Sequence, residues 1–214
     1  MTVSTKIKES IERSSWIRKM FEEGAKLKSQ FGAENVFDFS LGNPDLDPPE
    51  AFFEVLKKMS LEKKPGVHGY MPNAGFPYVR DAIAKKISRE QEVTITGNSI
   101  IMTCGAAGGM NVALKTILDP GDEVIVLKPF FAEYGFYISN HNGLMVQVDT
   151  AKDFSIDIEA IQRAITEKTR AIIINSPNNP TGKIYSESEI ESLCKLLDSK
   201  KPGGRPIFLI ADEP

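Results

Sequence analysis

The chain has 214 residues, of which 41% are hydrophobic and 26% are charged, the balance of an ordinary globular protein with one large domain or slightly more. Its 26 basic and 29 acidic residues give a net charge of −3 without a long block of one sign, so neither a nucleic-acid footprint nor a membrane-surface helix is suggested. No apolar run reaches the roughly 20 residues of a membrane span, and the charged amino terminus has no signal-peptide core, so a cytoplasmic location is expected. Cys104 and Cys194 form no CxxC pair, so neither a metal site nor a disulfide framework is expected.

The first part of the chain is expected to contain two helices joined by an extended segment. Apolar residues spaced by three and four predict an amphipathic helix over residues 15–29. An extended piece at 36–39 follows and ends in a turn with Gly42, whose lack of a side chain lets the backbone approach a ligand closely. Asp47 as a cap and Glu50 in a capping box predict the start of the second helix. The residues expected to face inward from it are Phe52, Phe53, Leu56 and Met59.

A long loop and a third helix lead into a regular alternation of strands and helices. The loop covers residues 67–75, and the helix after it carries apolar residues spaced by four. The expected strands are 100–103, 123–127, 144–148, 171–174 and 207–211. The expected later helices are 107–118, 131–141, 157–165 and 187–198. Such alternation predicts an α/β fold, with a mostly parallel sheet and helices on both faces.

The strand at 171–174 opens into the most informative loop of the chain. Three successive isoleucines favour a strand buried on both faces, and the prolines, asparagines and glycine of residues 175–182 stop it at once. A loop of this kind presents side chains, Asn179 among them, stiffly to a ligand at the carboxyl end of a sheet. A strand followed by an ordinary turn is the alternative interpretation of this stretch alone.

The segment after the strand at 100–103 suits a phosphate. Its small residues Gly105, Ala106 and Ala107 leave backbone amides accessible at the start of a helix, where the helix dipole adds positive potential. The segment is neither a dinucleotide fingerprint nor a P-loop, because the glycine spacing of both is absent. A tight helix entry needed only for packing is the alternative.

Two further strand ends carry residues suited to a flat ring with a protonated nitrogen. Phe131 comes after strand 123–127 and can stack on a planar ligand, although an aromatic residue at a helix start also serves simply as core. Asp212 comes after strand 207–211, where a buried carboxylate is costly unless it meets a cation. A helix cap and a surface ion pair are the alternatives for Asp212.

A phosphate, a flat ring and a basic ring nitrogen occur together in pyridoxal phosphate. The order and spacing of five short motifs also resemble the class I/II aminotransferases of fold type I, the aspartate aminotransferase-like enzymes, from about residue 15 to the end of the chain. These motifs are His68-Gly69-Tyr70, Asn73-Ala74-Gly75, the helix entry from Gly105 to Gly108, Asn179-Pro180-Thr181-Gly182 and Asp212. The resemblance implies a pyridoxal-phosphate-dependent enzyme that transfers an amino group between an amino acid and a 2-oxo acid.

The resemblance also implies how the cofactor is held. Its phosphate would be bound by the backbone of Gly105, Ala106 and Ala107. Phe131 would stack on the pyridine ring, where relatives often carry tyrosine or tryptophan. Asn179 would hydrogen-bond the phenolic oxygen, and Asp212 would pair with the pyridinium nitrogen, which keeps the ring protonated as an electron sink.

Partner and substrate contacts follow from the same resemblance. Tyr70 would reach the phosphate of a neighbouring subunit, which implies a homodimer, and Gly42 would offer its backbone to the amino-acid substrate. The two histidines, His68 and His141, match no catalytic position and are expected to be structural. The class as a whole implies a cytoplasmic, biosynthetic enzyme.

The lysine that forms the Schiff base with the cofactor follows the aspartate motif in the family, so it is expected beyond Pro214. The segment from Ser192 to Lys195 imitates the family's serine-to-lysine spacing, but it precedes that motif and is not given the role. Residues 1–45 are expected to form an N-terminal arm and helix, and residues 46–214 an incomplete cofactor-binding large domain, with the C-terminal small domain missing. The 214-residue chain alone is therefore expected to lack transaminase activity.

Three other interpretations stay open. A non-catalytic fragment or binding remnant of the same fold would bind the cofactor reversibly without turnover. A lyase or decarboxylase of the same fold would use most of the same residues. A nucleotide-binding α/β module would prefer a dinucleotide to pyridoxal phosphate.

Overall fold

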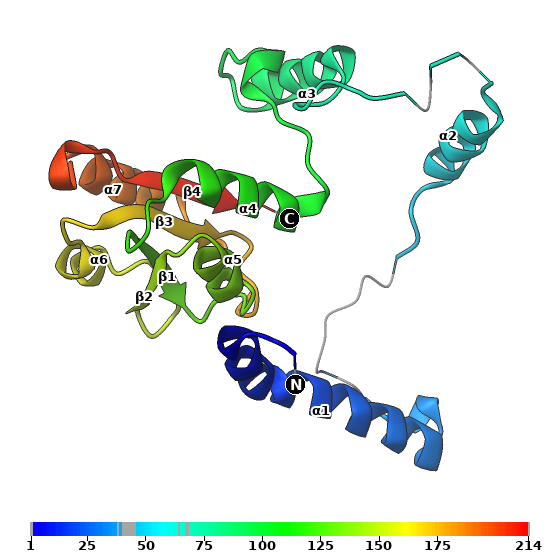
Figure 1. Cartoon of the computed structure of the whole chain (residues 1–214), viewed down its shortest axis with the longest axis horizontal. Helices are drawn as coiled ribbons and strands as arrows, with labels where there is room; N and C mark the ends of the chain where they lie inside the picture. Colours follow the sequence, from blue (N-terminus) through cyan, green and yellow to red (C-terminus); the bar gives the residue numbers. More distant parts are fainter. Residues whose placement is uncertain (1, 38, 40–45, 64, 67–68, 214) are drawn as a thin grey trace. The chain divides into compact units, whose positions relative to one another are not determined.

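The computed structural model of the chain describes residues 2–37, 39, 46–63, 65–66 and 69–213. The chain divides into two compact units, Met1–Gly69 and Tyr70–Pro214 (Figure 1). The domain boundary expected after residue 45 is a different division and stays a prediction. None of the helices in the described ranges combines the length and the apolar character that crossing a membrane requires.

The first unit is helical. Helix α1, Thr5–Phe31, starts earlier than the predicted 15–29, because the Ser4 side chain accepts a hydrogen bond from the Ile7 amide at 3.3 Å and caps the helix there. The elements after it are the 3-10 turn η1, Ala33–Asn35, and helix α2, Glu50–Leu61.

Helix α2 differs from its prediction in both its start and its packing. It begins at Glu50 behind Pro49 without a side-chain cap, so the predicted cap at Asp47 is wrong. The residues expected to be inside are between 45% and 61% exposed: Phe52, Phe53, Leu56 and Met59. Amphipathic spacing indicates that a helix has an apolar face, but not that its own unit covers that face. Within the described residues of the first unit, nothing buries it.

The second unit is built on a parallel four-stranded sheet in the order β2-β1-β3-β4. The strands are β1, Glu123–Lys128; β2, Leu144–Asp149; β3, Thr169–Asn175; and β4, Phe208–Asp212. All seven residues of β3 are buried, as the run of isoleucines predicts for a strand covered on both faces. The predicted α/β fold with a parallel sheet is confirmed.

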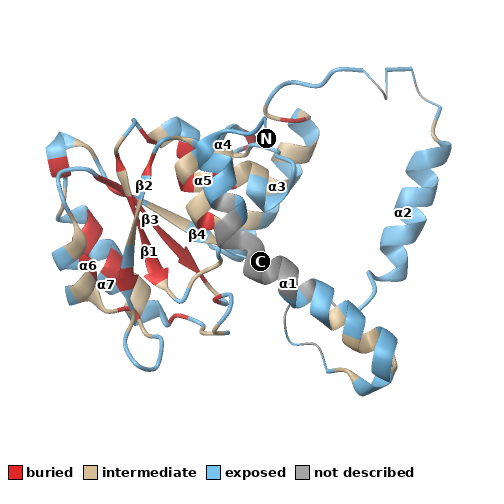
Figure 2. Cartoon of the chain, turned by 60° about the horizontal axis from the view of Figure 1, so that its bottom comes forward, coloured by how far each residue is buried: buried red, intermediate tan, exposed pale blue. Residues whose placement is uncertain are grey.

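Helices cover both faces of this sheet. They are α4, Gly105–Ile117; α5, Tyr134–Asn140; α6, Ile158–Ala164; and α7, Glu187–Asp198. Successive strand residues point to opposite faces, so Val126 and Ile173 pack in the core with α4 and α5, whereas Ile125 and Ile172 pack in the core with α6 and α7. Figure 2 shows the central strands β1 and β3 as mostly buried between the partly exposed helices. The α7 capping box of Ser186 and Glu189 forms as predicted.

The segment before α4 corrects one prediction. Helix α3, Pro77–Glu90, forms as expected, and the 3-10 turn η2, Gly97–Ser99, follows it. The strand predicted at 100–103 does not form, because Met102 donates its amide to the Ala74 carbonyl at 3.0 Å instead of pairing with a strand. The last short turn, η3, Pro202–Gly204, lies just before β4.

Candidate functional site

The candidate site lies at the carboxyl edge of the parallel sheet, where strand ends from distant parts of the chain meet. Asn175, the last residue of β3, pairs in register with Asp212, the last residue of β4. β1 ends nearby in the sheet at Lys128, and its following loop carries Phe131. α4 leads into the amino end of β1, so its own amino end, with Gly105, points back towards the carboxyl edge.

Asp212 is held by a buried tyrosine. The Tyr134 hydroxyl donates to Asp212 Oδ2 at 2.6 Å, and the tyrosine side chain is buried in the core between the sheet, α4 and α5. Among the described residues this is the one side chain that donates to the carboxylate. Asp212 itself is half-buried, so its charge is set in place at the sheet edge and remains accessible to a cationic ligand.

Burial and the hydrogen bond to Asp212 raise the pKa of Tyr134 well above its ordinary value of 10. The unfolded chain releases this proton near pH 10, whereas the folded chain retains it. The stability that this shift contributes is therefore present below pH 10 and is lost as the pH rises above it. The hydroxyl consequently stays a donor to the carboxylate across the neutral range.

Replacing Tyr134 with phenylalanine should leave the phenolate absorbance near pH 10 unchanged, because the buried tyrosine does not ionise there in the folded chain. The measurement is a spectrophotometric pH titration of the folded wild-type chain against the variant. Tyr134→Phe should remove an absorbance step only in alkali well above pH 10, or on unfolding. A step near pH 10 that disappears in the variant would contradict the tie to Asp212.

Phe131 lies beside this pair. Its ring meets the Tyr134 ring edge to face, with centroids 5.7 Å apart and an angle of 84° between the planes. It precedes α5, which begins at Tyr134 rather than at the predicted residue 131. Phe131 is half-buried against the core, so part of its surface remains available for a flat ligand.

The amino end of α4 has the properties of an anion site. Gly105, Ala106 and Ala107 are exposed, no side chain caps the helix, and its first turn carries no acidic residue. Gly105 has φ +69°, and a Cβ there would meet nothing within 4 Å, so the space in front of the backbone is open. The Gly105 amide donates to the Thr103 carbonyl at 3.1 Å, which leaves the first-turn amides of Ala106 and Ala107 as the donors for an anion.

Hydrogen bonds of its own side chains hold the loop after β3 in place. Asn178 is buried, and its Oδ1 accepts hydrogen bonds from the amide and the hydroxyl of Thr181, at 3.3 Å and 2.9 Å. At the end of the loop, Lys183 donates to Ser155 Oγ at 2.9 Å and pairs with Asp153. Hydrogen bonds from Ser155 lower the pKa of Asp153 to about 2. The loop is thus rigid, while Asn179 in it stays exposed.

The other predicted site residues are exposed or lie outside the described residues. Tyr70 is fully exposed, as a residue that reaches another subunit would be. Gly42 and His68 lie outside the described residues. His141 shares a hydrogen bond of 3.2 Å with Asn111 on α4. In the described ranges, no three His, Cys, Asp or Glu side chains gather as a metal site.

Two residues of the cluster were not predicted from sequence. Tyr134 reads as an ordinary core aromatic of a helix, and only the pairing of β3 with β4 brings Asp212 within its reach. Asn175 is a polar residue at the end of a fully buried strand. A buried polar side chain needs a hydrogen-bond partner, but the strand pattern does not indicate which residue that partner is.

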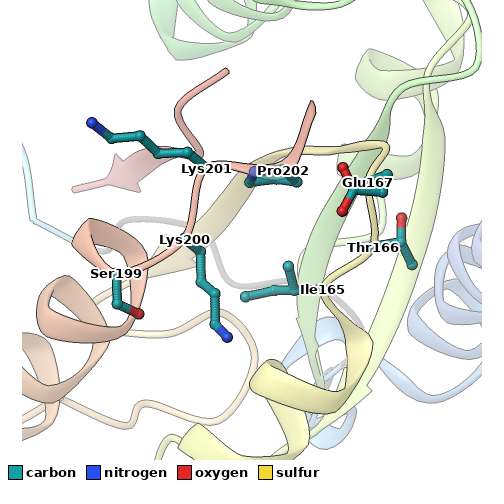
Figure 3. A pocket seen from close by; sticks show the side chains of 7 residues that line it. All are labelled: Ile165, Thr166, Glu167, Ser199, Lys200, Lys201 and Pro202. Carbon is teal, nitrogen blue, oxygen red and sulfur yellow. The ribbon is translucent and has the colours of Figure 1, made fainter. Parts of the chain in front are cut away.

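A separate hollow of about 430 Å³ lies at the opposite, amino edge of the sheet (Figure 3). Its lining comes from the segments before β3 and β4: Ile165, Thr166, Glu167, Ser199, Lys200, Lys201 and Pro202. Three of its polar side chains are already engaged, since Thr166 bonds Glu123, Ser199 bonds the Leu196 carbonyl and Glu167 accepts from Gly203. The two lysines extend in different directions, so they do not converge on a common ligand.

Known proteins resemble the chain over nearly its whole length. The family described as aminotransferase class I and II matches residues 34–213. The aspartate/prephenate aminotransferase of Thermus thermophilus is 37% identical over 174 residues, which are 80% of this chain and 43% of that protein. The aspartate aminotransferase of Thermotoga maritima is 34% identical over 200 residues, 92% of this chain and 51% of that protein.

Solved structures give the same result. An amino transferase from Eubacterium rectale superposes with a TM-score of 0.93 at 36% identity and covers 100% of this chain, which in turn covers 55% of that one. The chain thus spans about half the length of the relatives that it matches. Class I and II aminotransferases are pyridoxal-phosphate-dependent enzymes. With the family matching 34–213 and the parallel sheet in common, the chain belongs to the class I and II aminotransferases.

Proposed function

We propose that this chain forms the cofactor-binding part of an enzyme that transfers an amino group between an amino acid and a 2-oxo acid. The observation that carries the proposal is the Asp212 carboxylate, held by the buried Tyr134 hydroxyl at 2.6 Å at the carboxyl edge of the sheet. A carboxylate kept in place and half-exposed is suited to a protonated ring nitrogen.

The residues at this edge fit pyridoxal phosphate by their chemistry. The uncapped amino end of α4, which begins at Gly105, offers the amides of Ala106 and Ala107 and positive potential for the phosphate. The half-buried Phe131 offers a face for the pyridine ring, and Asp212 offers a charge for its nitrogen. When bound, the cofactor supplies an electron sink for the carbon that bears the amino group.

The chain's own part in the reaction is to hold and orient. Asp212 would hold the proton on the ring nitrogen, because an ion pair at this position favours the charged form of the nitrogen. Asn179 would donate to the phenolic oxygen, and its exposure on a loop that Asn178 and Lys183 hold by hydrogen bonds supports this role. The stiffness of that loop limits the entropy lost when the ligand is ordered.

Partner, substrate and domain assignments belong to the same proposal. Tyr70, fully exposed, would complete the phosphate site of a second copy, which makes the enzyme a homodimer. Gly42 would face the amino-acid substrate. Residues 1–45 would serve as arm and helix, and residues 46–214 as the large domain, in a cytoplasmic protein.

The activity is tested by incubating the complete enzyme with an amino acid and a 2-oxo acid and identifying the products. Formation of a new amino acid together with the 2-oxo acid of the donor, in equal amounts, is the expected result. Release of ammonia or carbon dioxide in place of amino transfer would contradict the proposal and favour a lyase or decarboxylase. A preference for a dinucleotide over pyridoxal phosphate would contradict the assignment of the site itself.

Replacing Asn179 with alanine in the complete enzyme should shift the visible absorption of the bound cofactor and its pH dependence, because one donor to the phenolic oxygen is lost. The affinity for the cofactor should fall by about 3- to 10-fold, in line with one hydrogen bond of roughly 0.5–1.5 kcal/mol. Thr181 in the same loop is not suited as a control, because it bonds Asn178. Ser188→Ala on the exposed surface of α7 is suited. An unchanged spectrum for Asn179→Ala would leave this loop as an ordinary turn.

A further inference from the structure

Asn175 occupies the point where the two strands of the site end. It is the last residue of β3 and only 6% exposed. Its Nδ2 donates to the backbone carbonyl of Asp212 at 2.8 Å, and its Oδ1 accepts from the backbone amide of Asn179 at 2.6 Å. One buried side-chain amide therefore joins the backbones of two residues that the proposed function places on the cofactor. These two hydrogen bonds of the Asn175 side chain are called the bracket below.

The chemistry of the partners fixes the orientation of this amide. A carbonyl can only accept and a backbone N–H can only donate, so Nδ2 must face Asp212 and Oδ1 must face Asn179. Reversing the amide would set like groups against each other on both sides. The Asn175 side chain thus adds one hydrogen bond between β3 and β4 at the last pair of their register, and a second hydrogen bond to the loop that follows β3.

The loop has few other ways to satisfy its backbone here. Pro177 and Pro180 have no N–H, so the loop between them has two backbone donors, the amides of Asn178 and Asn179. The Asn178 amide donates to the Lys183 carbonyl at 2.8 Å. Without Asn175, the Asn179 amide would lose its partner at the sheet edge.

We propose that Asn175 is a positioning residue that fixes the spacing between Asp212 and Asn179. Through these two residues it would fix the position in which the pyridine ring binds. The inference rests on the proposed function and adds to it a residue that does not touch the ligand itself. A site held from one side chain keeps the ring-nitrogen contact and the phenolic-oxygen contact in register with each other.

Different substitutions separate the two bonds. Asn175→Asp keeps an acceptor for the Asn179 amide but loses the donor to the Asp212 carbonyl and adds repulsion there. Asn175→Ala loses both bonds. Thr169→Val is the matched control, because Thr169 is fully buried at the opposite end of the same strand and accepts one local hydrogen bond, from the Thr166 amide at 2.9 Å.

The bracket is tested without cofactor by amide hydrogen exchange of the 214-residue chain, followed by NMR. The Asn179 amide should exchange about tenfold faster in Asn175→Ala, while Asn175→Asp should retain most of its protection. Thr169→Val should leave the Asn179 amide as in the wild type. Equal exchange in wild type and Asn175→Ala, or equal acceleration by Thr169→Val, would overturn the bracket.

The positioning role is tested by equilibrium dialysis of the same four chains against pyridoxal phosphate. We expect about tenfold weaker binding for Asn175→Ala and for Asn175→Asp, and a change within about twofold for Thr169→Val. Faster exchange at Asn179 with unchanged binding would overturn the positioning role. If the wild-type chain did not bind the cofactor while the exchange result held, the proposed function would fail and the bracket would stand as a structural feature.

Discussion

Replacing Asp212 with asparagine should weaken the binding of pyridoxal phosphate by about 10- to 100-fold, the largest effect expected at the site. The charge that faces the ring nitrogen disappears, and a hydrogen bond to a charged group is worth roughly 1.5–3 kcal/mol. The asparagine can still accept from the Tyr134 hydroxyl, so the fold around it is kept. Equilibrium dialysis of the variant chain against the cofactor measures the change.

A matched control lies at the same edge of the sheet. Asp149 ends β2 as Asp212 ends β4, but it is exposed and pairs with Lys128 at 2.8 Å. Asp149→Asn removes the same charge and should change cofactor affinity by less than about threefold, because exposed ion pairs contribute little. Equal losses in both variants would mean that the overall charge of the edge, rather than a pair with the ring nitrogen, governs binding.

The sheet could be predicted from the sequence because its strands are apolar runs separated by turn residues and helical spacing. Strands β1, β2 and β3 and helix α7 agree with their predictions to within two residues at each boundary. In β3, the isoleucines of 172–174 alternate between the two faces of the sheet, each covered by helices. Local pattern and tertiary packing agree here, so the pattern is sufficient.

Two predictions failed because they depend on partners that a local pattern does not specify. The segment 100–103 has strand composition, but Ile101 is 59% exposed and the Met102 amide is taken by Ala74. Helix α2 has an apolar face whose residues Phe52 and Phe53 remain exposed. Composition sets what a segment prefers, and the neighbouring elements decide whether that preference is realised.

The candidate site was partly predictable for the same reason. Asp212 and Asn179 stand out because each is polar and follows an apolar strand, and parallel strands bring their carboxyl ends together. The contacts of Tyr134 and Asn175 depend instead on which strands are neighbours and in what register. These contacts join residues that are far apart in the sequence: Asn175 and Asp212 are 37 positions apart, and Tyr134 and Asp212 are 78 positions apart.

Ion pairs stabilise the amino edge of the sheet, whereas side-chain hydrogen bonds stabilise its carboxyl edge. Asp122 is buried and accepts from both sides: Arg205 Nη2 lies 2.7 Å from its Oδ2, and the Asp119 amide donates to the same oxygen at 2.9 Å. The buried Arg170 brings its Nε to 3.6 Å from Asp122, an ion-pair contact longer than a hydrogen bond. Arg170 in turn bonds the Pro202 carbonyl at 3.2 Å, beside the hollow of Figure 3.

Replacing Asp122 with alanine should lower the free energy of unfolding of the second unit by about 3–5 kcal/mol. The buried Arg170 guanidinium would lose its counter-charge, and removing one partner of a buried pair leaves an uncompensated charge in the interior. Urea unfolding followed by far-ultraviolet circular dichroism measures this change.

Asp119→Ala provides the comparison that isolates burial. Asp119 pairs with the same arginine, Arg205, at 2.7 Å, but its side chain is 74% exposed, so its loss should cost only about 0–1 kcal/mol. A large gap between the two variants would show that the buried pair of Asp122 and Arg170 stabilises the amino edge. If Asp122→Ala cost no more than Asp119→Ala, solvent would already compensate Arg170, and the pairing of β1 with β3 alone would hold this end of the sheet.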